Sequence, residues 1–566
     1  MLLNPKIEYY AHLDQYSRRI MQKTITFFEG KGKQQVKQDH FDRVWYDDFL
    51  AFVKENKIFA SLLTPPAYAT DDPNIRWDTF RNCDFNEILG FYGLAYWYTW
   101  QVSVLGLGPI WMSSNETIKR KAAKKLNEGG IFAFGLSEKA HGADLYNSEM
   151  ALTPLGEGRY VADGGKYYIG NANKAALVST FGKNSETDEY VFFAVQPHHE
   201  NYELVKNVVH WQSYVAEYAL HSYPITDEDI LSSGQEAWDT ALNTVNVGKY
   251  NLGWASIGIC THALYEAITH AGNRNLYRRY VTDFPHIRRL FMDAYTRLVA
   301  MRLFARRASD YMRSASAEDR RYLLYNSLVK MKVTTQGEKV IDLLWDVIAA
   351  KGFEKDVYFE NATSDIRALP KLEGTVHVNM ALIVKFMSNY FFNPDSFPEI
   401  AVCNHPTHDT FLFDQGPTRG LGQIRFHDYR LAYDAIDLPN IAIFKRQVQA
   451  LTNLLMSAPP DKQQTKEMDF LLCLGELFTQ VVYGQLLIEK SRIDRVEDDL
   501  LDQIFDFMVR DFSKYALNLY NHPNSNAVQM DHCLHMIEKP AGNPIRFERL
   551  WKKYVIILKD AYEMDP

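Results

Sequence analysis

One segment of this chain places a carboxylate where it could act as a base. Glu373 lies in the run Leu372-Glu-Gly-Thr375, between an apolar residue and a glycine. Such a neighbourhood desolvates a carboxylate and raises its pKa towards the pH at which an enzyme works, which suits proton abstraction. An isolated glutamate before Gly-Thr is otherwise an ordinary residue near the start of a helix.

A second segment, Phe134-Gly-Leu-Ser-Glu-Lys-Ala-His-Gly-Ala-Asp144, is rich in small and hydroxyl-bearing residues. It precedes Glu373 by about 230 residues. In this order and at this distance, the two segments resemble the two signatures of the acyl-CoA dehydrogenase family. The resemblance implies FAD as the hydride acceptor, because no side chain can accept hydride.

The first signature resembles Thr-Glu-Pro-x-x-Gly-Ser-Asp, and the resemblance implies a flavin-binding loop. Ser137 stands at the threonine position and keeps a hydroxyl that could donate to the flavin ring, with Phe134 and Leu136 beside it. Gly142 lets the backbone approach the cofactor closely. Ala143 replaces the family's serine, so one hydroxyl near cofactor and substrate is lost.

The run Lys166-Tyr-Tyr-Ile-Gly-Asn-Ala-Asn-Lys174 resembles the family's Lys-x-Trp-Ile-Thr-Asn-Gly. By this resemblance Tyr168 would stack on the flavin in place of tryptophan. Gly170 replaces a threonine, so that hydroxyl contact must come from the backbone or be absent.

Two further matches concern the diphosphate of FAD. Ala350, Lys351 and Gly352 resemble part of a Gly-Gly-x-Gly-Phe/Tyr turn, and Gly352 lies 21 residues before Glu373. Arg274 and Tyr277 resemble the Arg-x-x-Phe pair that binds the FAD of a neighbouring subunit, a role for which a planar guanidinium is suited. On composition alone, Arg274 lies in a run with Arg278 and Arg279 that fits a solvated helix face better, and only its register with the following helix favours the FAD role.

The resemblance also implies roles around Glu373. Thr375 and His377 take positions that contact FAD, and Gly374 and Lys249 take positions near the substrate, as does Ala143. Glu373 would remove the α-proton of a fatty acyl-CoA while the β-hydrogen leaves as hydride. The electrons would pass to an electron-transfer flavoprotein, and the enzyme would be a homodimer or homotetramer. Similarity of the C-terminal extension to very-long-chain members favours a long acyl chain.

Two other functions remain open at this point. An acyl-CoA oxidase returns electrons to oxygen, but oxidases of this superfamily more often carry Glu-Gly-Asp than Glu-Gly-Thr. A catalytically silent homologue is favoured by the substitutions at Ala143 and Gly170 and opposed by the presence of Glu373. The histidines of His198-His-Glu200 and His405-Pro-Thr-His408 lack a third ligand at metal-binding spacing, so we predict no metal site.

Composition limits the class of protein. A chain of 566 residues is too long for one core and predicts three or four domains. A net charge of −8 and a pI of about 6.1 argue against nucleic acid as a partner. Five cysteines without CxxC spacing suit reduced thiols, and the first residues resemble neither a signal nor a transit peptide, so we expect a cytoplasmic protein.

The pattern along the chain predicts an α+β fold that is mainly α. We expect an N-terminal helical domain (1–125), a central small β-domain (126–235), a four-helix bundle (236–392), a long connection (393–429) and an additional C-terminal helical domain (430–566). A hairpin is expected at Asp163-Gly164, and long helices from Ile287 and over 322–350. The uncharged stretch 88–115 predicts a buried helix pair rather than a transmembrane segment; peripheral membrane association remains possible.

Overall fold

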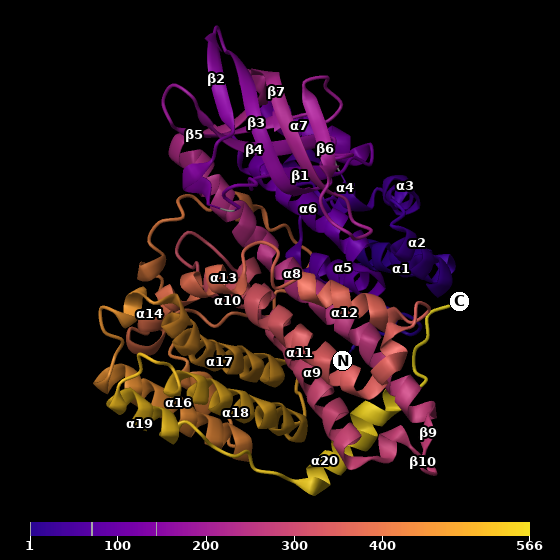
Figure 1. Ribbon diagram of the computed structural model, residues 1–566, viewed down its shortest axis with the longest axis vertical. Coiled ribbons are helices and arrows are strands. Elements are labelled where there is room, and N and C mark those ends of the chain that lie inside the picture. Colours follow the sequence, from indigo (N-terminus) through magenta and orange to yellow (C-terminus); the bar gives the residue numbers. More distant parts are fainter. Residues whose placement is uncertain (1, 70–71, 143) are drawn as a thin grey trace. The chain divides into compact units, whose positions relative to one another are not determined.

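The computed structural model describes residues 2–69, 72–142 and 144–566, which form two compact units (Figure 1). The first, which we call the sheet unit, comprises Tyr9–Asn251, Asn404–Arg419 and Met564–Pro566. The second, which we call the helical unit, comprises the residues up to Glu8 with Leu252–Cys403 and Gly420–Glu563. Helix α8, Gly234–Asn273, contributes residues to both.

The sheet unit begins with seven helices: α1 Gln15–Lys31, α2 Lys33–Asp42, α3 Asp47–Glu55, α4 Ile58–Leu63, α5 Thr79–Tyr92, α6 Leu94–Met112 and α7 Glu116–Asn127. Several start at residues suited to the task. The side chains of Asp14, Asp78 and Asn115 accept hydrogen bonds from backbone N–H groups in the first turns of α1, α5 and α7. These N-caps satisfy donors that a helix end leaves without partners.

The uncharged stretch 88–115 is buried, as predicted, but it is not a helix pair: after the last turn of α5 it consists mainly of the single helix α6, which continues through Pro109. Every residue of α5 and nearly every residue of α6 is buried. The Asn86 side chain donates to Asn251 Oδ1 (2.7 Å) and accepts from the indoles of Trp97 (2.8 Å) and Trp100 (3.1 Å). Polar groups inside this apolar layer are therefore hydrogen-bonded to one another, as burial demands.

An eight-stranded sheet follows, with the order β6-β7-β3-β2-β4-β5-β8 and with β1 paired to β4. Its strands are β1 Phe132–Gly135, β2 Ala151–Gly156, β3 Arg159–Gly170, β4 Leu177–Asn184, β5 Tyr190–Val195, β6 Tyr202–Asn207, β7 Val215–Thr226 and β8 Ile230–Ser233. Both β1 and β2 run parallel to β4, and the other pairs are antiparallel.

The hairpin predicted at Asp163-Gly164 is wrong, because β3 continues through these residues. Gly164 has φ +139°, and the pairing of β3 with β7 shifts register between Ala162 and Gly164, which marks a β-bulge. The turn between β2 and β3 lies instead at Glu157-Gly158, with φ +55° and +67°. Two successive positive φ angles are what a type I′ turn requires.

The helical unit contains the remaining elements: α9 Pro285–Arg313, α10 Tyr322–Leu328, α11 Thr334–Ile348, α12 Tyr358–Ala368, α13 Val376–Ile383, α14 Met387–Phe392, α15 Arg430–Asp434, α16 Pro439–Ser457, α17 Met468–Ile493, α18 Asp498–Tyr520, α19 Ala527–His535, α20 Pro544–Leu550, and strands β9 Asn275–Leu276 and β10 Arg279–Tyr280. Helix α9 confirms the amphipathic pattern from Ile287. The helix predicted over 322–350 is interrupted by a π-helical turn, Val329–Val333.

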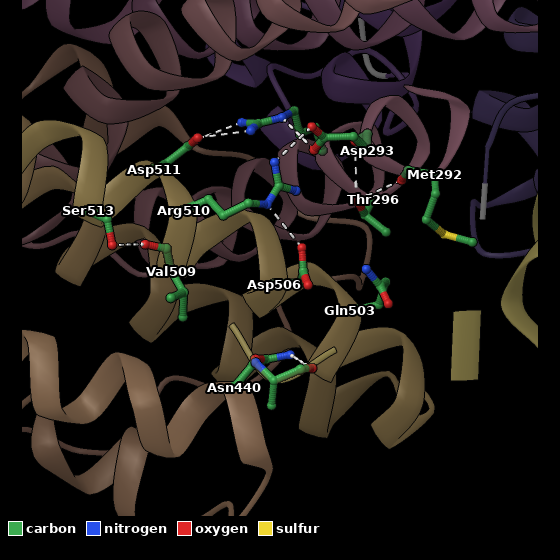
Figure 2. Close-up of polar contacts among 12 residues, drawn as sticks. Met292, Asp293, Thr296, Asn440, Gln503, Asp506, Val509, Arg510, Asp511 and Ser513 are labelled. Atoms are coloured by element: carbon green, nitrogen blue, oxygen red, sulfur yellow. Dashed lines mark hydrogen bonds and ion pairs between the residues drawn. The ribbon is translucent and has the colours of Figure 1, made fainter. Parts of the chain in front are cut away.

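Bundle helices and C-terminal helices share one core in this unit. Helix α9 packs against α11, α17 and α18 (Figure 1). Arg297 on α9 makes a two-pronged ion pair with Asp511 on α18 (2.7 and 2.9 Å), and Arg510 reaches back to Asp293 (3.3 Å) (Figure 2). Helix α17, alone among the described helices, is long and apolar enough to cross a membrane, and most of it is buried in the protein.

The predicted fold class, α+β and mainly helical, is confirmed. Residues 393–429 carry two short 3-10 turns, Thr410–Phe413 and Leu421–Gln423, between α14 and α15. Part of this stretch belongs to the sheet unit. The division of the chain into five segments stays a prediction.

Candidate active site

Glu373 lies in a tight turn of the helical unit, between the end of α12 and Thr375. The Thr375 hydroxyl accepts from the backbone N–H of Val378 (3.4 Å) and so caps α13. Glu373 and Gly374 both adopt the left-handed conformation, with φ +53° and +85°. This conformation costs a residue with a Cβ about 1–2 kcal/mol, and strain of this kind collects at functional sites.

The side chain of Glu373 is half-buried, and its Oε2 atom is inaccessible to water. Gly374, Thr375 and His377 follow within one turn, and the side chains of Thr375 and His377 are exposed. The turn and the start of α13 thus carry the Glu373 carboxylate together with three other residues that the sequence singles out.

Lys330 also reaches this turn, although sequence reasoning missed it. It lies on the π-helical turn and is fully buried, and its Nζ donates to Pro370 O (2.8 Å) and to Gly374 O. Gly374 O also accepts from the Asn379 side chain (3.0 Å). The available signal was a pair of lysines inside the apolar run Leu328-Val-Lys-Met-Lys-Val333, since a lysine among core residues needs partners.

Gly352 lies in a 3-10 turn, Ala349–Phe353, that follows α11. A Cβ on Gly352 would lie 3.1 Å from both Ile348 Cγ2 and Phe359 Cδ1, so packing alone favours glycine there. Ala349 adopts φ +54°, a conformation that suits the glycine found at this position in the family motif. Ala350 is exposed, and Lys351 pairs with Glu354 (2.5 Å).

Arg274 and Tyr277 project from the end of α8. They lie in or beside the hairpin of β9 and β10, whose tip is formed by Tyr277 and Arg278 with φ +53° and +65°. Arg274 is exposed, and the Tyr277 side chain is 90% exposed. An aromatic ring presented to solvent on a tight turn suits contact with another molecule.

In the sheet unit, the loop after β1 is fastened to β3. The Ser137 hydroxyl donates to Tyr167 O (2.8 Å), and the Tyr167 N–H donates to Ser137 O (3.0 Å). The only proton of that hydroxyl is thus engaged within the protein, and its predicted donation to a flavin stays a prediction. Phe134 lies on β1 and is buried, and Leu136 O accepts from Lys166 Nζ (3.0 Å).

A buried ion pair that the sequence did not single out supports the same loop. Glu138 accepts from Lys166 Nζ (2.6 Å), from Ser148 Oγ (2.6 Å) and from two backbone N–H groups. Burial lowers the pKa of Lys166 to about 8, against the opposing effect of Glu138. Burial works to raise the pKa of Glu138, but Lys166 and the hydrogen bonds outweigh it and lower that pKa.

The glycine of the first signature has the conformation that the motif demands. Gly142 has φ +59° and exchanges two backbone hydrogen bonds with Glu138 (3.1 and 2.7 Å). A Cβ built on Gly142 meets no atom within 4 Å, so the backbone faces open space. Ala143 lies outside the described residues.

Tyr168 and Gly170 occupy the end of β3. Tyr168 has φ +69° at a second register shift between β3 and β7, and its ring is 39% exposed. A bulge of this kind re-aims a side chain. A Cβ on Gly170 would lie 2.6 Å from Tyr98 Cε1 and 2.7 Å from Val102 Cγ2 on α6. Close packing of α6 therefore explains why a glycine replaces the threonine of the family motif.

Lys249 lies on the part of α8 that belongs to the sheet unit and is 5% exposed. Its Nζ donates to Asn246 Oδ1 (3.4 Å). Taken together, the sequence-selected residues fall into two groups, one in each unit. The sheet unit contains Lys249, the loop after β1 and the end of β3. The helical unit contains Arg274, the Gly352 turn and the Glu373 turn.

One cluster among the described residues has metal-capable side chains. Ligand atoms of Glu138, His141 and Glu149 lie within 4.8 Å of one another. However, Lys166 places an ammonium 2.6 Å from Glu138, where it would repel a metal cation. The ion pair explains the buried carboxylate better than a metal does.

Comparison with known proteins identifies the helical region around Glu373. Residues 236–388 match the family model described as acyl-CoA dehydrogenase, C-terminal domain. The chain is similar to the caffeyl-CoA reductase–Etf complex subunit CarC of Acetobacterium woodii, with 24% identity over 51% of this chain and 77% of that protein. It is also similar to the mitochondrial very long-chain specific acyl-CoA dehydrogenase of Mus musculus, with 21% identity over 64% of this chain and 56% of the relative.

A solved structure matches nearly the whole length. The crystal structure of an acyl-CoA dehydrogenase complexed with FAD from Bacillus anthracis superposes with a TM-score of 0.73. It is 16% identical and covers 99% of this chain and 97% of that one. Its coverage includes the helices after residue 430, so the additional C-terminal helices are part of a fold already seen.

Proposed function

Since this chain belongs to the acyl-CoA dehydrogenase family, we propose that it introduces a double bond between carbons 2 and 3 of a fatty acyl-CoA with the help of FAD. The observation that carries the proposal is the turn at Glu373, which holds a partly buried carboxylate in a strained left-handed conformation. Electron-transfer flavoprotein is the proposed electron acceptor, supported by the naming of an Etf complex for one relative.

Glu373 acts as the base in this proposal. The thioester carbonyl acidifies the α-hydrogen of an acyl-CoA, and Glu373 removes it as a proton. By the resemblance, Gly374 and Lys249 each take a position that contacts substrate. Bound substrate that excludes water lets proton transfer to the carboxylate occur at close range.

The residues present fit FAD. Gly142 leaves its backbone open to a neighbouring group, and the bulge at Tyr168 turns an aromatic ring outward. We propose that these residues, with Phe134, Leu136 and Ser137, bind the flavin ring. By the resemblance, Gly352, Thr375 and His377 also contact FAD, and Arg274 binds the diphosphate of a neighbouring subunit's FAD. When bound, FAD supplies a hydride acceptor, which the side chains of the protein cannot.

We further propose a long-chain substrate, at least a homodimer, and a cytoplasmic location. The relative that is specific for very long chains supports the first of these, and the exposed hairpin carrying Tyr277 supports the second. Turnover of a C16 acyl-CoA should exceed that of a short-chain acyl-CoA; the reverse order would refute the preference.

The absorption spectrum of the purified protein tests the proposal. We expect a yellow protein whose flavin absorbance is bleached by an acyl-CoA without oxygen. A colourless protein that takes up no FAD would overturn it. Oxygen consumption with substrate and no added acceptor would instead identify an oxidase.

A further inference from the structure

We propose that Lys330 is a positioning residue for Glu373, because its buried ammonium fixes the backbone on both sides of that carboxylate. The inference rests on the proposed function, in which Glu373 is the base. Lys330 would not touch substrate; it would act through the turn that carries Glu373.

Two carbonyl acceptors of Lys330 lie on either side of Glu373 in the chain. Pro370 O lies three residues before Glu373, and Gly374 O belongs to the residue directly after it. The Lys330 ammonium therefore connects the backbone before the turn to the backbone after it by hydrogen bonds. Because Glu373 and Gly374 are both left-handed, the turn needs such external support to keep this conformation over a relaxed one.

Burial of Lys330 carries an energetic cost. An ammonium with no exposed surface has lost its hydration, and interactions within the protein have to offset that loss. An apolar side chain of similar length, such as methionine, would fill the same space without that cost. A lysine kept at such a position therefore indicates a task beyond filling the core.

The helix is modified at this point. Lys330 lies in the π-helical turn Val329–Val333 between α10 and α11, and such turns occur frequently at functional sites. The Thr334 hydroxyl donates to Lys330 O (2.5 Å), which satisfies a carbonyl in the widened turn. The local fold thus accommodates a helix irregularity at the residue that holds the Glu373 turn.

Lys332 provides a matched control. It lies in the same π-helical turn and is 1% exposed, but its Nζ faces Tyr515 Oη (3.4 Å) and Glu476 (3.8 Å). The same substitution at Lys332 removes a buried ammonium from the same element without touching the Glu373 turn. A loss of activity common to both variants would result from disturbance of the π-helical turn. A loss found only in the Lys330 variants would result from disturbance of the Glu373 turn.

The experiment compares Lys330→Met, Lys330→Gln and Lys332→Met with the wild type and Glu373→Gln. The measurements are FAD content, the single-turnover rate of flavin bleaching by a C16 acyl-CoA without oxygen, the KM for that substrate, and exchange of the α-hydrogen with solvent deuterium. We expect both neutral Lys330 variants to keep FAD and KM and to lose about tenfold to a hundredfold in bleaching and exchange rates, since small displacements of a reacting group have such effects. Lys332→Met should keep both rates.

A wild-type bleaching rate in either folded Lys330 variant would overturn the proposal, and so would an equal loss in Lys332→Met. The glutamine variant decides if the methionine variant does not fold. Failure of the proposed function gives a different result: wild-type protein that an acyl-CoA does not bleach, or Glu373→Gln that bleaches as fast as wild type. In that case the assignment of Lys330 falls with the base it was meant to position.

Discussion

At Gly170, the residue type is determined by side chains that are close in space but distant in sequence. The family motif carries threonine there, and its loss could be taken as a lost cofactor contact. In the structure, α6 leaves no room for a side chain, because Tyr98 and Val102 already lie within 2.7 Å of an added Cβ. The substitution therefore follows from packing and carries no implication that the protein is silent.

Gly170→Ala should destabilise the protein by about 1–3 kcal/mol, the usual effect of overpacking a tight site. Urea unfolding measures the change. Gly422→Ala is the matched control, because a Cβ on Gly422 meets nothing within 4 Å and its φ is not positive. Equal stability of the two variants would show that α6 yields at Gly170.

Residue identity could be read from sequence where a motif exists. Glu373, Gly352 and Gly142 were selected in this way, and their roles stay predictions; Gly142 does adopt a positive φ. Lys330 and Glu138 could not be assigned, because each acts through partners more than ten residues away in the chain. Only three-dimensional proximity reveals what a buried charge holds.

At the scale of elements, the hairpin of β9 and β10 is the feature that most clearly faces outward. Its tip presents Tyr277 and Arg278 at positive φ, with Arg274 at its base. An exposed aromatic ring on a tight turn suits contact with another molecule. On the Arg-x-x-Phe resemblance, we propose that this molecule is a neighbouring subunit with its FAD.

Arg274→Ala should therefore yield protein largely free of FAD and rescued by excess FAD. Loss of a charge-assisted bidentate contact lowers affinity about tenfold to a hundredfold. Flavin content after gel filtration, with and without added FAD, measures the effect. Arg278→Ala on the same exposed hairpin should retain its flavin. A monomer that binds FAD tightly, or unchanged FAD content in Arg274→Ala, would refute the assignment.

Helices with a hydrophobic period that extends over many residues were predicted well. Elements were predicted poorly where a glycine is compatible with two local structures. The amphipathic face of α9 is predicted correctly because many residues contribute to its period. The stretch 88–115 is predicted correctly to be buried, but it is mainly the single helix α6. Asp163-Gly164 predicts a turn because a bulge and a type I′ turn both favour glycine at positive φ. The π-helical turn before α11 leaves no such trace, since its residues keep ordinary helical types.

At the scale of the molecule, the additional C-terminal helices are part of the helical unit. The ion pairs among Arg297, Asp511, Arg510 and Asp293 join α9 to α18 (Figure 2). Burial works to raise the pKa of Asp511, but Arg297 outweighs it and lowers the pKa to about 2. The ionised pair thus stabilises the folded state.

The ion pair of Asp511 and Arg297 makes the free energy of unfolding depend on pH in the acidic range. Because the pKa of Asp511 is depressed from 3.8 to about 2 on folding, its contribution is complete above pH 4 and is lost as the pH falls towards 2. The shift corresponds to about 2 kcal/mol. Urea unfolding between pH 5 and 2 should show a smaller pH dependence in Asp511→Asn than in wild type. Asp434→Asn, which breaks the exposed pair with Lys445, is a surface control and should change the free energy of unfolding little at pH 7.

Anaerobic bleaching of the flavin in Glu373→Gln tests most directly whether Glu373 is the base. Glutamine matches glutamate in size but cannot accept the α-proton. The variant should purify with full yellow colour and bind acyl-CoA as the wild type does. We expect rapid bleaching of wild-type protein by a C16 acyl-CoA and no bleaching of the variant. Equal bleaching of both proteins would contradict the assignment of Glu373 as the base.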